Sequence, residues 1–249
     1  MKLLTAIPVY NEERHLDAVL QEVRRYSPHI LVVNDGSTDG TAQLLAKHAD
    51  LNVVTHDKNR GYGAALVSAF DYALHKSDCD VLVTMDCDGQ HEPSRIPVLM
   101  EAIHDADLVS GSRYLREFRQ QTLPTPADRL YINQTITHEL NAQLGLNLTD
   151  AFCGFKAYRR QALGKLCITE TGWGMPLQVW VQAAKLGLRI KEVGVPRLYL
   201  DPTRAFGGML NDATERLAYY RRIIADALLE TTTSCAWSCD SVPVTRSCR

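Results

Sequence analysis

From Lys2 to Gly111, short apolar runs alternate with longer stretches in which apolar residues recur at helical spacing. The short runs are rich in β-branched residues and predict strands over Leu3–Val9, Ile30–Asn34, Asn52–Thr55, Val81–Met85 and Leu108–Ser110. The helical spacing predicts helices over Glu12–Tyr26, Gly40–His48, Gly61–Ala73 and Pro93–Ile103. This alternation is typical of βα units. The sequence therefore predicts an α/β fold with a mostly parallel central sheet flanked by helices.

The alternation stops after Tyr114. The later pattern predicts a loop over Gln120–Pro126, a helix that ends at Leu144, a strand over Gly154–Tyr158, a helix over Pro176–Leu186, a strand over Arg189–Val193 and a helix over Leu210–Glu230. We expect one main domain over residues 1–208, a C-terminal helical extension over residues 209–230, and a disordered tail over residues 231–249.

Composition narrows the classes of partner. The chain has 249 residues, 45% of them apolar, which is enough for a full core. Its 27 basic and 29 acidic side chains form no long run of one sign, which argues against binding of nucleic acid through its phosphates. The sequence contains neither a secretory signal pattern nor an apolar run of the roughly 20 residues that span a bilayer. We expect a cytoplasmic protein.

Membrane contact would then be peripheral or made through a partner protein. The last predicted helix carries Arg216, Arg221 and Arg222, which would suit a bilayer surface. The alternative is that its Leu/Ile stripe docks onto the main domain.

The segment Asp86-Cys87-Asp88-Gly89-Gln90 follows the apolar run that ends at Met85. Residues i and i+2 of an extended chain point the same way, so Asp86 and Asp88 can approach one cation, and Gln90 adds an amide oxygen with the same parity. Oxygen ligands of this kind suit Mg²⁺ or Mn²⁺. We therefore predict Asp86, Asp88 and Gln90 as metal ligands. A simple turn after a strand is the alternative.

Two other predicted strands also end in polar residues. Asp35 follows the second strand and could accept hydrogen bonds from a base or a ribose. Tyr10 and Glu12 follow the first strand, although a capping turn explains that segment equally well. In parallel sheets ligands bind at the carboxyl ends of the strands, where all of these residues fall.

A glycine-rich connection over Asn59–Ala65 includes Gly61 and looks like a phosphate cradle. It is neither a Rossmann fingerprint nor a P-loop, which removes the main support for dinucleotide or ATP binding. Small residues that let a helix pack close to the sheet are the alternative explanation.

Together these motifs resemble glycosyltransferase family 2, which has the GT-A fold, and within it the dolichyl- or polyprenyl-phosphate mannosyltransferase-like members. The resemblance covers roughly residues 3–208, which would be the catalytic domain. It is carried by Ile7–Glu13, Asp35, Asp86–Gln90, Gly111–Tyr114 and Cys153–Lys156.

The resemblance implies roles for particular residues. Nucleotide-sugar binding would involve Pro8, Tyr10, Glu12, Asp35, Gly61, Asp86 and Arg204, the last gripping the diphosphate. The acceptor phosphate would be bound by Ser112, Arg113 and Arg129, and catalysis would depend on Asp88, Arg113 and Arg129. Gln178 stands where many members of the family carry an acidic residue.

The implied activity is inverting transfer of mannose or glucose from GDP-mannose or UDP-glucose to a polyprenyl phosphate, with a divalent cation assisting departure of the diphosphate. A phosphate monoester loses its second proton near pH 6, so it is already anionic at neutral pH and can attack without a strong base. A hydroxyl acceptor would need a general base, and no residue is assigned to that role. The same donor chemistry with a soluble or saccharide hydroxyl, and a non-catalytic nucleotide-sugar-binding protein, are the alternatives. The oligomeric state stays open.

Overall fold

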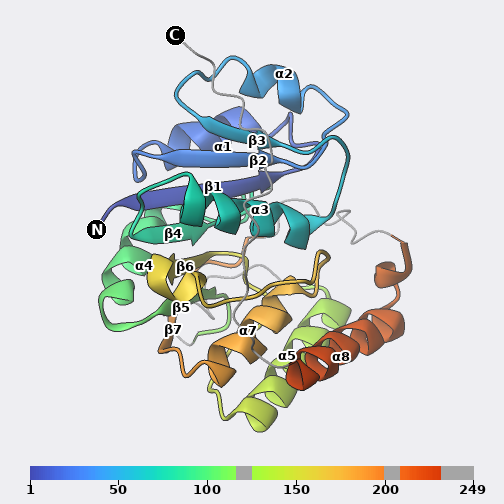
Figure 1. The fold of residues 1–249 in the computed structure, drawn as a ribbon. Coiled ribbons are helices and arrows are strands. Elements are labelled where there is room, and N and C mark those ends of the chain that lie inside the picture. Colours follow the sequence, from blue (N-terminus) through green and yellow to red (C-terminus); the bar gives the residue numbers. More distant parts are fainter. Residues whose placement is uncertain (116–124, 199–207, 231–249) are drawn as a thin grey trace.

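The computed structural model describes residues 1–115, 125–198 and 208–230. Within them, one seven-stranded sheet has the order β3-β2-β1-β4-β6-β5-β7 (Figure 1). Its strands are β1 (Leu3–Val9), β2 (Ile30–Asn34), β3 (Asn52–Thr55), β4 (Val81–Thr84), β5 (Leu108–Ser112), β6 (Lys156–Arg159) and β7 (Ile190–Gly194). Strand β6 runs antiparallel between β4 and β5, and all other neighbouring pairs are parallel.

Helices cover both faces of this sheet. One face carries α1 (Leu16–Val23), α2 (Thr41–Leu45) and α4 (Ile96–Ala102), with short 3₁₀ turns at Pro93–Arg95 and Ile103–Asp105. The other face carries α3 (Tyr62–His75), α5 (Ala127–Leu144), α6 (Arg160–Leu163), α7 (Met175–Lys185) and α8 (Ala213–Leu229), the last preceded by a 3₁₀ turn at Gly208–Asn211. Alternate residues of a strand enter opposite cores: Leu4 and Ala6 face the α3 side, while Ile7 and Val9 face the α1 side.

The predicted fold class is confirmed, since the sheet is mostly parallel and lies between two helical layers. The largest error in a boundary concerns α1, which begins at Leu16 instead of Glu12. The chain turns first at Asn11, whose φ is 56°. The Asn11 side-chain oxygen accepts hydrogen bonds from the N–H groups of Thr38 and Asp39, so this segment joins the neighbouring loop before the helix starts.

Helix α8 packs against α5 and α7, as Figure 1 shows at the lower right of the molecule. Its Tyr220 and Ile224 lie in the core on the α3 side of the sheet. Arg216 is buried and pairs with Asp128 of α5 at 2.7 Å, and Arg221 pairs with Glu139 of α5 at 2.5 Å.

The possible membrane contact of this helix cannot include Arg216, because a buried, paired guanidinium cannot reach a bilayer. Docking of the helix onto the domain is confirmed. The domain division at residue 208 stays a prediction, and the predicted tail over residues 231–249 lies outside the described residues. None of the described helices is long and apolar enough to cross a membrane.

Candidate active site

The carboxyl ends of β2, β4 and β5 bring Asp35, Asp86 and Arg113 to the same edge of the sheet. Strand β6 runs in the opposite direction, so the residues that precede it arrive at this edge as well. Gly154 shows how closely they approach, because a Cβ atom there would lie 2.9 Å from Asp86 Oδ2. The edge therefore combines residues from the first and the second half of the chain.

The acidic segment bends immediately after β4 ends at Thr84. The Gln90 N–H donates to Asp88 Oδ1 at 3.0 Å, and Gly89 has a φ of 73°. Because of this turn the segment is not extended, so the argument that Gln90 points the same way as Asp86 and Asp88 is wrong. The assignment of Asp86, Asp88 and Gln90 as metal ligands stays a prediction.

Asp86 is held by its neighbours and is still reachable from solvent. Its side chain is 30% exposed, and Oδ1 accepts a hydrogen bond from the Tyr62 hydroxyl at 3.1 Å. Its backbone N–H donates to Nδ1 of the buried His91 at 3.0 Å, which places the imidazole proton on Nε2. The His91 ring lies against Phe155, with the ring centroids 5.2 Å apart. The orientation of Asp86 is therefore fixed from both sides.

A buried lysine lies close to this segment. Lys156 donates to the Cys153 carbonyl, and its ammonium group lies 5.1 Å from the centre of the Trp180 ring. Burial lowers the pKa of Lys156, while the charges of Asp150 and Asp86 act in the opposite direction. The lysine therefore lies beneath the edge of the sheet without being exposed on it.

Asp35 is buried and hydrogen-bonded within the protein. Its Oδ1 accepts from the Arg60 N–H at 2.8 Å and lies 2.6 Å from His56 Nδ1, and its Oδ2 accepts from the Gly61 N–H at 2.9 Å. These bonds fix the glycine-rich connection. The expected contact of Asp35 with a base or ribose stays a prediction, as do the roles of Pro8, Tyr10 and Glu12. Tyr10 is 44% exposed and Glu12 is buried.

The glycines of that connection have a packing role. A Cβ on Gly61, whose φ is 102°, would lie 2.6 Å from the Thr171 carbonyl oxygen, and one on Gly63 would lie 2.5 Å from the Glu170 carbonyl oxygen. Both glycines therefore pack against the backbone around residues 170–172. The sequence had suggested a phosphate or the sheet as their neighbour. A ligand contact for Gly61 stays a prediction.

We expect Gly63→Ala to lower the free energy of unfolding by about 1–3 kcal/mol, because the added methyl group overpacks against backbone that cannot rotate away. Chemical denaturation measures this directly. Gly164→Ala is the matched control, since its Cβ would meet its nearest neighbours at 3.6 Å, an ordinary contact. Equal stability of the two variants would contradict the packing role.

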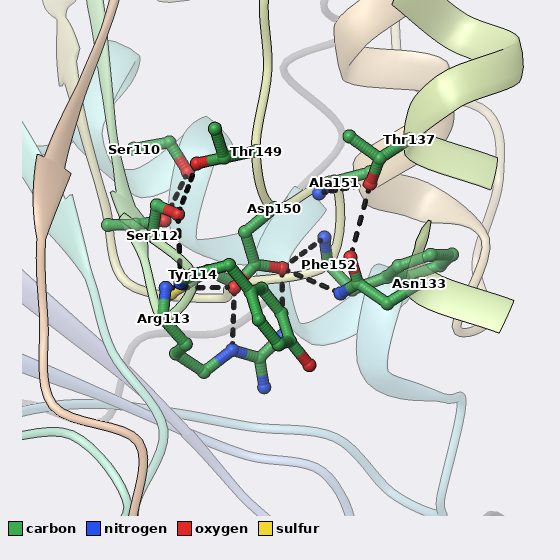
Figure 2. Close-up of polar contacts among 12 residues, drawn as sticks. Ser110, Ser112, Arg113, Tyr114, Asn133, Thr137, Thr149, Asp150, Ala151 and Phe152 are labelled. Carbon is green, nitrogen blue, oxygen red and sulfur yellow. Dashed lines mark hydrogen bonds and ion pairs between the residues drawn. The ribbon is translucent and has the colours of Figure 1, made fainter. Parts of the chain in front are cut away.

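Arg113 and Asp150 form a buried ion pair at the end of β5 (Figure 2). Arg113 Nε donates to Asp150 Oδ2 at 2.7 Å and Nη2 donates to Oδ1 at 2.9 Å, the parallel two-bond geometry that is strongest for this pair. Ser112 Oγ lies 2.5 Å from Thr149 Oγ1 beside them. The Arg113 side chain is 19% exposed and that of Asp150 is fully buried, so the guanidinium reaches the surface from a fixed carboxylate.

Further bonds hold Asp150 in place. Asn133 of α5 donates to Oδ1 at 2.8 Å, and the carboxylate of Glu192 accepts from the N–H groups of Thr149 and Asp150. Burial alone would raise the pKa of Asp150, but the charge and hydrogen bonds of Arg113, with the bond from Asn133, hold it well below its usual value. The pair is therefore ionised at neutral pH.

Two more arginines bear on the predicted acceptor site. Arg129 lies one turn before Asn133 on α5, and its charge acts on Tyr220 of α8, so its expected contact with an acceptor phosphate stays a prediction. Arg197 follows β7, and its guanidinium lies 5.3 Å from the centre of the Tyr114 ring, with that of Arg113 at 5.9 Å from the same ring. Sequence reasoning missed Arg197, although a basic residue just after a strand was a usable signal. Arg204 lies outside the described residues.

Comparisons with known proteins identify the family of the chain. Residues 5–167 match the model of Glycosyl transferase family 2. An undecaprenyl-phosphate mannosyltransferase of Micrococcus luteus is 35% identical over 86% of this chain and 91% of its own length. A polyprenol monophosphomannose synthase of Mycolicibacterium smegmatis is 33% identical over 78% of this chain and 76% of its own length.

A crystal structure of glucosyl-3-phosphoglycerate synthase from Mycobacterium tuberculosis, in complex with Mn²⁺, UDP and phosphoglyceric acid, has a TM-score of 0.64. The match covers 92% of this chain and 77% of the other at 20% identity, a level at which the likeness shows the fold alone. The expected GT-A fold is confirmed. The family match extends from the first strand through the acidic segment to the residues beyond β6. Because this match covers more than half of the chain, the protein belongs to glycosyl transferase family 2.

Proposed function

We propose that this protein transfers mannose from GDP-mannose to a polyprenyl phosphate, with inversion at the sugar carbon. The observation that carries the proposal is the pair of relatives, 35% and 33% identical over most of both chains, whose names are those of polyprenyl-phosphate mannosyltransferases. Partly exposed Arg113, oriented by Asp150 at the shared edge of the sheet, supports a phosphate acceptor.

The donor side of the proposal includes Mg²⁺ or Mn²⁺ bound by Asp86, Asp88 and Gln90. These are hard oxygen donors at a partly exposed edge, and three of them leave room for diphosphate oxygens and water, as Mg²⁺ usually requires. The described residues contain no cluster of three or more His, Cys, Asp or Glu side chains suited to a metal. When bound, the cation would neutralise the departing diphosphate.

The chain's own groups then have separate tasks. The Tyr62 hydroxyl orients Asp86, and Asp150 orients Arg113 by binding its Nε and Nη2. Within the described residues Arg113 Nη1 makes no hydrogen bond, so it can donate to a phosphate oxygen, with Arg129 as the second cation. An anionic phosphate aligned in this way needs no general base. Because a polyprenyl chain resides in the bilayer, we place the reaction at the membrane surface.

Mass spectrometry tests the proposal with purified protein, Mg²⁺ or Mn²⁺, a short polyprenyl phosphate, and either GDP-mannose or UDP-glucose. We expect a mannosyl-phosphate lipid with GDP-mannose. The unphosphorylated polyprenol is the matched control and should give no product, since its hydroxyl would need a base. Product from UDP-glucose alone would overturn the donor, and product from the alcohol but not the phosphate would overturn the acceptor.

A further inference from the structure

The segment from Thr169 to Gly174, which leads into α7, joins the C-terminal helix to the start of α3. On the α8 side, the Tyr219 hydroxyl donates to Glu170 Oε1 at 2.6 Å and accepts from the Gly174 N–H at 3.2 Å. The same Glu170 oxygen accepts from the Gly172 N–H at 2.7 Å. One hydroxyl group on α8 therefore holds both ends of a tight turn.

Helix α7 holds the beginning of this segment. The Gln178 side-chain oxygen accepts from the N–H groups of Thr169 and Glu170, each at 2.9 Å, while its amide group donates to Thr169 Oγ1 at 2.7 Å. An acidic side chain could accept the first two bonds but could not donate the third at neutral pH. Glutamine at this position thus fixes the segment on its α7 side.

On the opposite side, the segment packs on the start of α3. The Thr171 carbonyl accepts from the Ala64 N–H at 3.0 Å, and Gly61 and Gly63 leave no space for a side chain between the two backbones. Any shift of the segment would therefore shift the first turn of α3, where Tyr62 lies.

The segment ends at a stacked aromatic pair that reaches the acidic residues. The Trp173 ring lies on the Tyr62 ring, with centroids 4.9 Å apart and planes 13° from parallel. The Tyr62 hydroxyl bonds to Asp86 Oδ1 at 3.1 Å, and a Cβ on Gly154 would lie 2.6 Å from that hydroxyl. Tyr62 is thus confined by an indole ring on one side and by backbone on the other.

We propose that Tyr219 of α8 is a positioning residue for the cation site: through the 169–174 segment and Trp173 it holds the Tyr62 hydroxyl on Asp86. This inference rests on the proposed function, because it takes Asp86 as a ligand of the donor-bound cation. The C-terminal helix thereby becomes a structural part of donor binding, although its sequence lies far from the acidic segment.

The test is calorimetric binding of GDP, with UDP in parallel, in the presence and absence of Mn²⁺. We expect Tyr62→Phe and Tyr219→Phe each to weaken the Mn²⁺-dependent binding by about threefold to tenfold, the net effect of one typical intramolecular hydrogen bond. Tyr220→Phe is the matched control and should bind like the wild type. Tyr220 is the next residue on α8 and is buried, and within the described residues its hydroxyl makes no hydrogen bond.

A double variant separates positioning from general stability. If Tyr219 acts through Tyr62, Tyr219→Phe should have no further effect on Mn²⁺-dependent binding once Tyr62 is phenylalanine. Additive losses, or a Tyr219→Phe protein with wild-type affinity, would overturn the inference and leave the proposed function intact. If the nucleotide affinity of the wild-type protein does not change with Mn²⁺, the assignment of the cation site is wrong, and the inference about Tyr219 is wrong as well.

Discussion

Replacement of Asp88 by alanine is expected to lower glycosyl transfer by about a hundredfold to a thousandfold, while the protein stays folded. The reason is electrostatic, since a carboxylate that holds the cation on the leaving diphosphate contributes mainly in the transition state. Initial rates with saturating donor, at several Mg²⁺ or Mn²⁺ concentrations, measure this effect. Part of the loss should be recovered at high metal concentration if the remaining ligands still bind the cation.

Asp78→Ala is a suitable control for this experiment. Asp78 precedes β4 at the opposite end of the strand and forms an exposed ion pair with Lys2, so its loss should leave the rate unchanged. Wild-type activity in Asp88→Ala would remove the aspartate from the cation site. An unfolded Asp88→Ala protein would mean that the acidic turn, closed by the Gln90 N–H, has a structural role instead.

Replacement of Asp150 by asparagine is expected to lower the free energy of unfolding by about 3–5 kcal/mol, because Arg113, whose side chain is only 19% exposed, would keep its charge without a counter-charge. The new amide would also point an N–H group at a guanidinium that can only donate. For a chain of this length, the melting temperature should fall by about 10 °C. Thermal and chemical denaturation measure the two quantities.

The chain contains a matched control for this pair. Arg113 binds Asp150 through its backbone N–H as well as through Nε and Nη2. Arg189 binds Asp107 with the same three groups, but its side chain is 60% exposed. Asp107→Asn should therefore change stability little, because solvent screens an exposed pair. If Asp150→Asn and Asp107→Asn lose the same stability, burial of the ion pair does not determine how much stability is lost.

The same carboxylate gives the wild type a dependence on pH. The pKa of Asp150 is lower in the folded than in the unfolded protein, where it lies near 3.9, so the pair stabilises the fold above about pH 4. This contribution should be lost as the pH falls through the folded pKa. The free energy of unfolding of the wild type should therefore fall between pH 5 and pH 2. In Asp150→Asn this fall should be smaller, because the Asp150 carboxylate is absent.

Much of the fold could be predicted because it depends on local patterns. The runs Ile30–Asn34 and Asn52–Thr55 are strands with the predicted bounds, since each is rich in β-branched residues and followed by polar residues. The direction of β6 and its place between β4 and β5 could not be predicted, because pairing between distant strands leaves no local pattern. The short helix α6 was missed for a related reason, as four residues are too few to show helical spacing.

The place of a candidate residue was predictable where it follows the end of a strand, as Asp86 and Arg113 do, while the roles of these residues stay predictions. It was not predictable where a group acts through a partner far along the chain. Nothing near Tyr62 in the sequence indicates its contact with Trp173, and nothing near Asp35 shows that its oxygens hold the Arg60 and Gly61 N–H groups. Such contacts depend on three-dimensional closeness, which a single sequence does not reveal.

The central position of β6 has a consequence for how the chain folds. Strands β1 to β4 form one parallel block and β5 with β7 forms another. Among the strands of the described residues β6 alone joins the two blocks, pairing Thr84 with Lys156 on one side and Leu108 with Tyr158 on the other. A nascent chain that has not yet emerged to residue 159 can pair the first block but cannot attach β5 to it. Assembly must wait for contacts between residues far apart in sequence, which slows folding. The acidic segment and the Arg113–Asp150 pair therefore come together only when this late strand inserts.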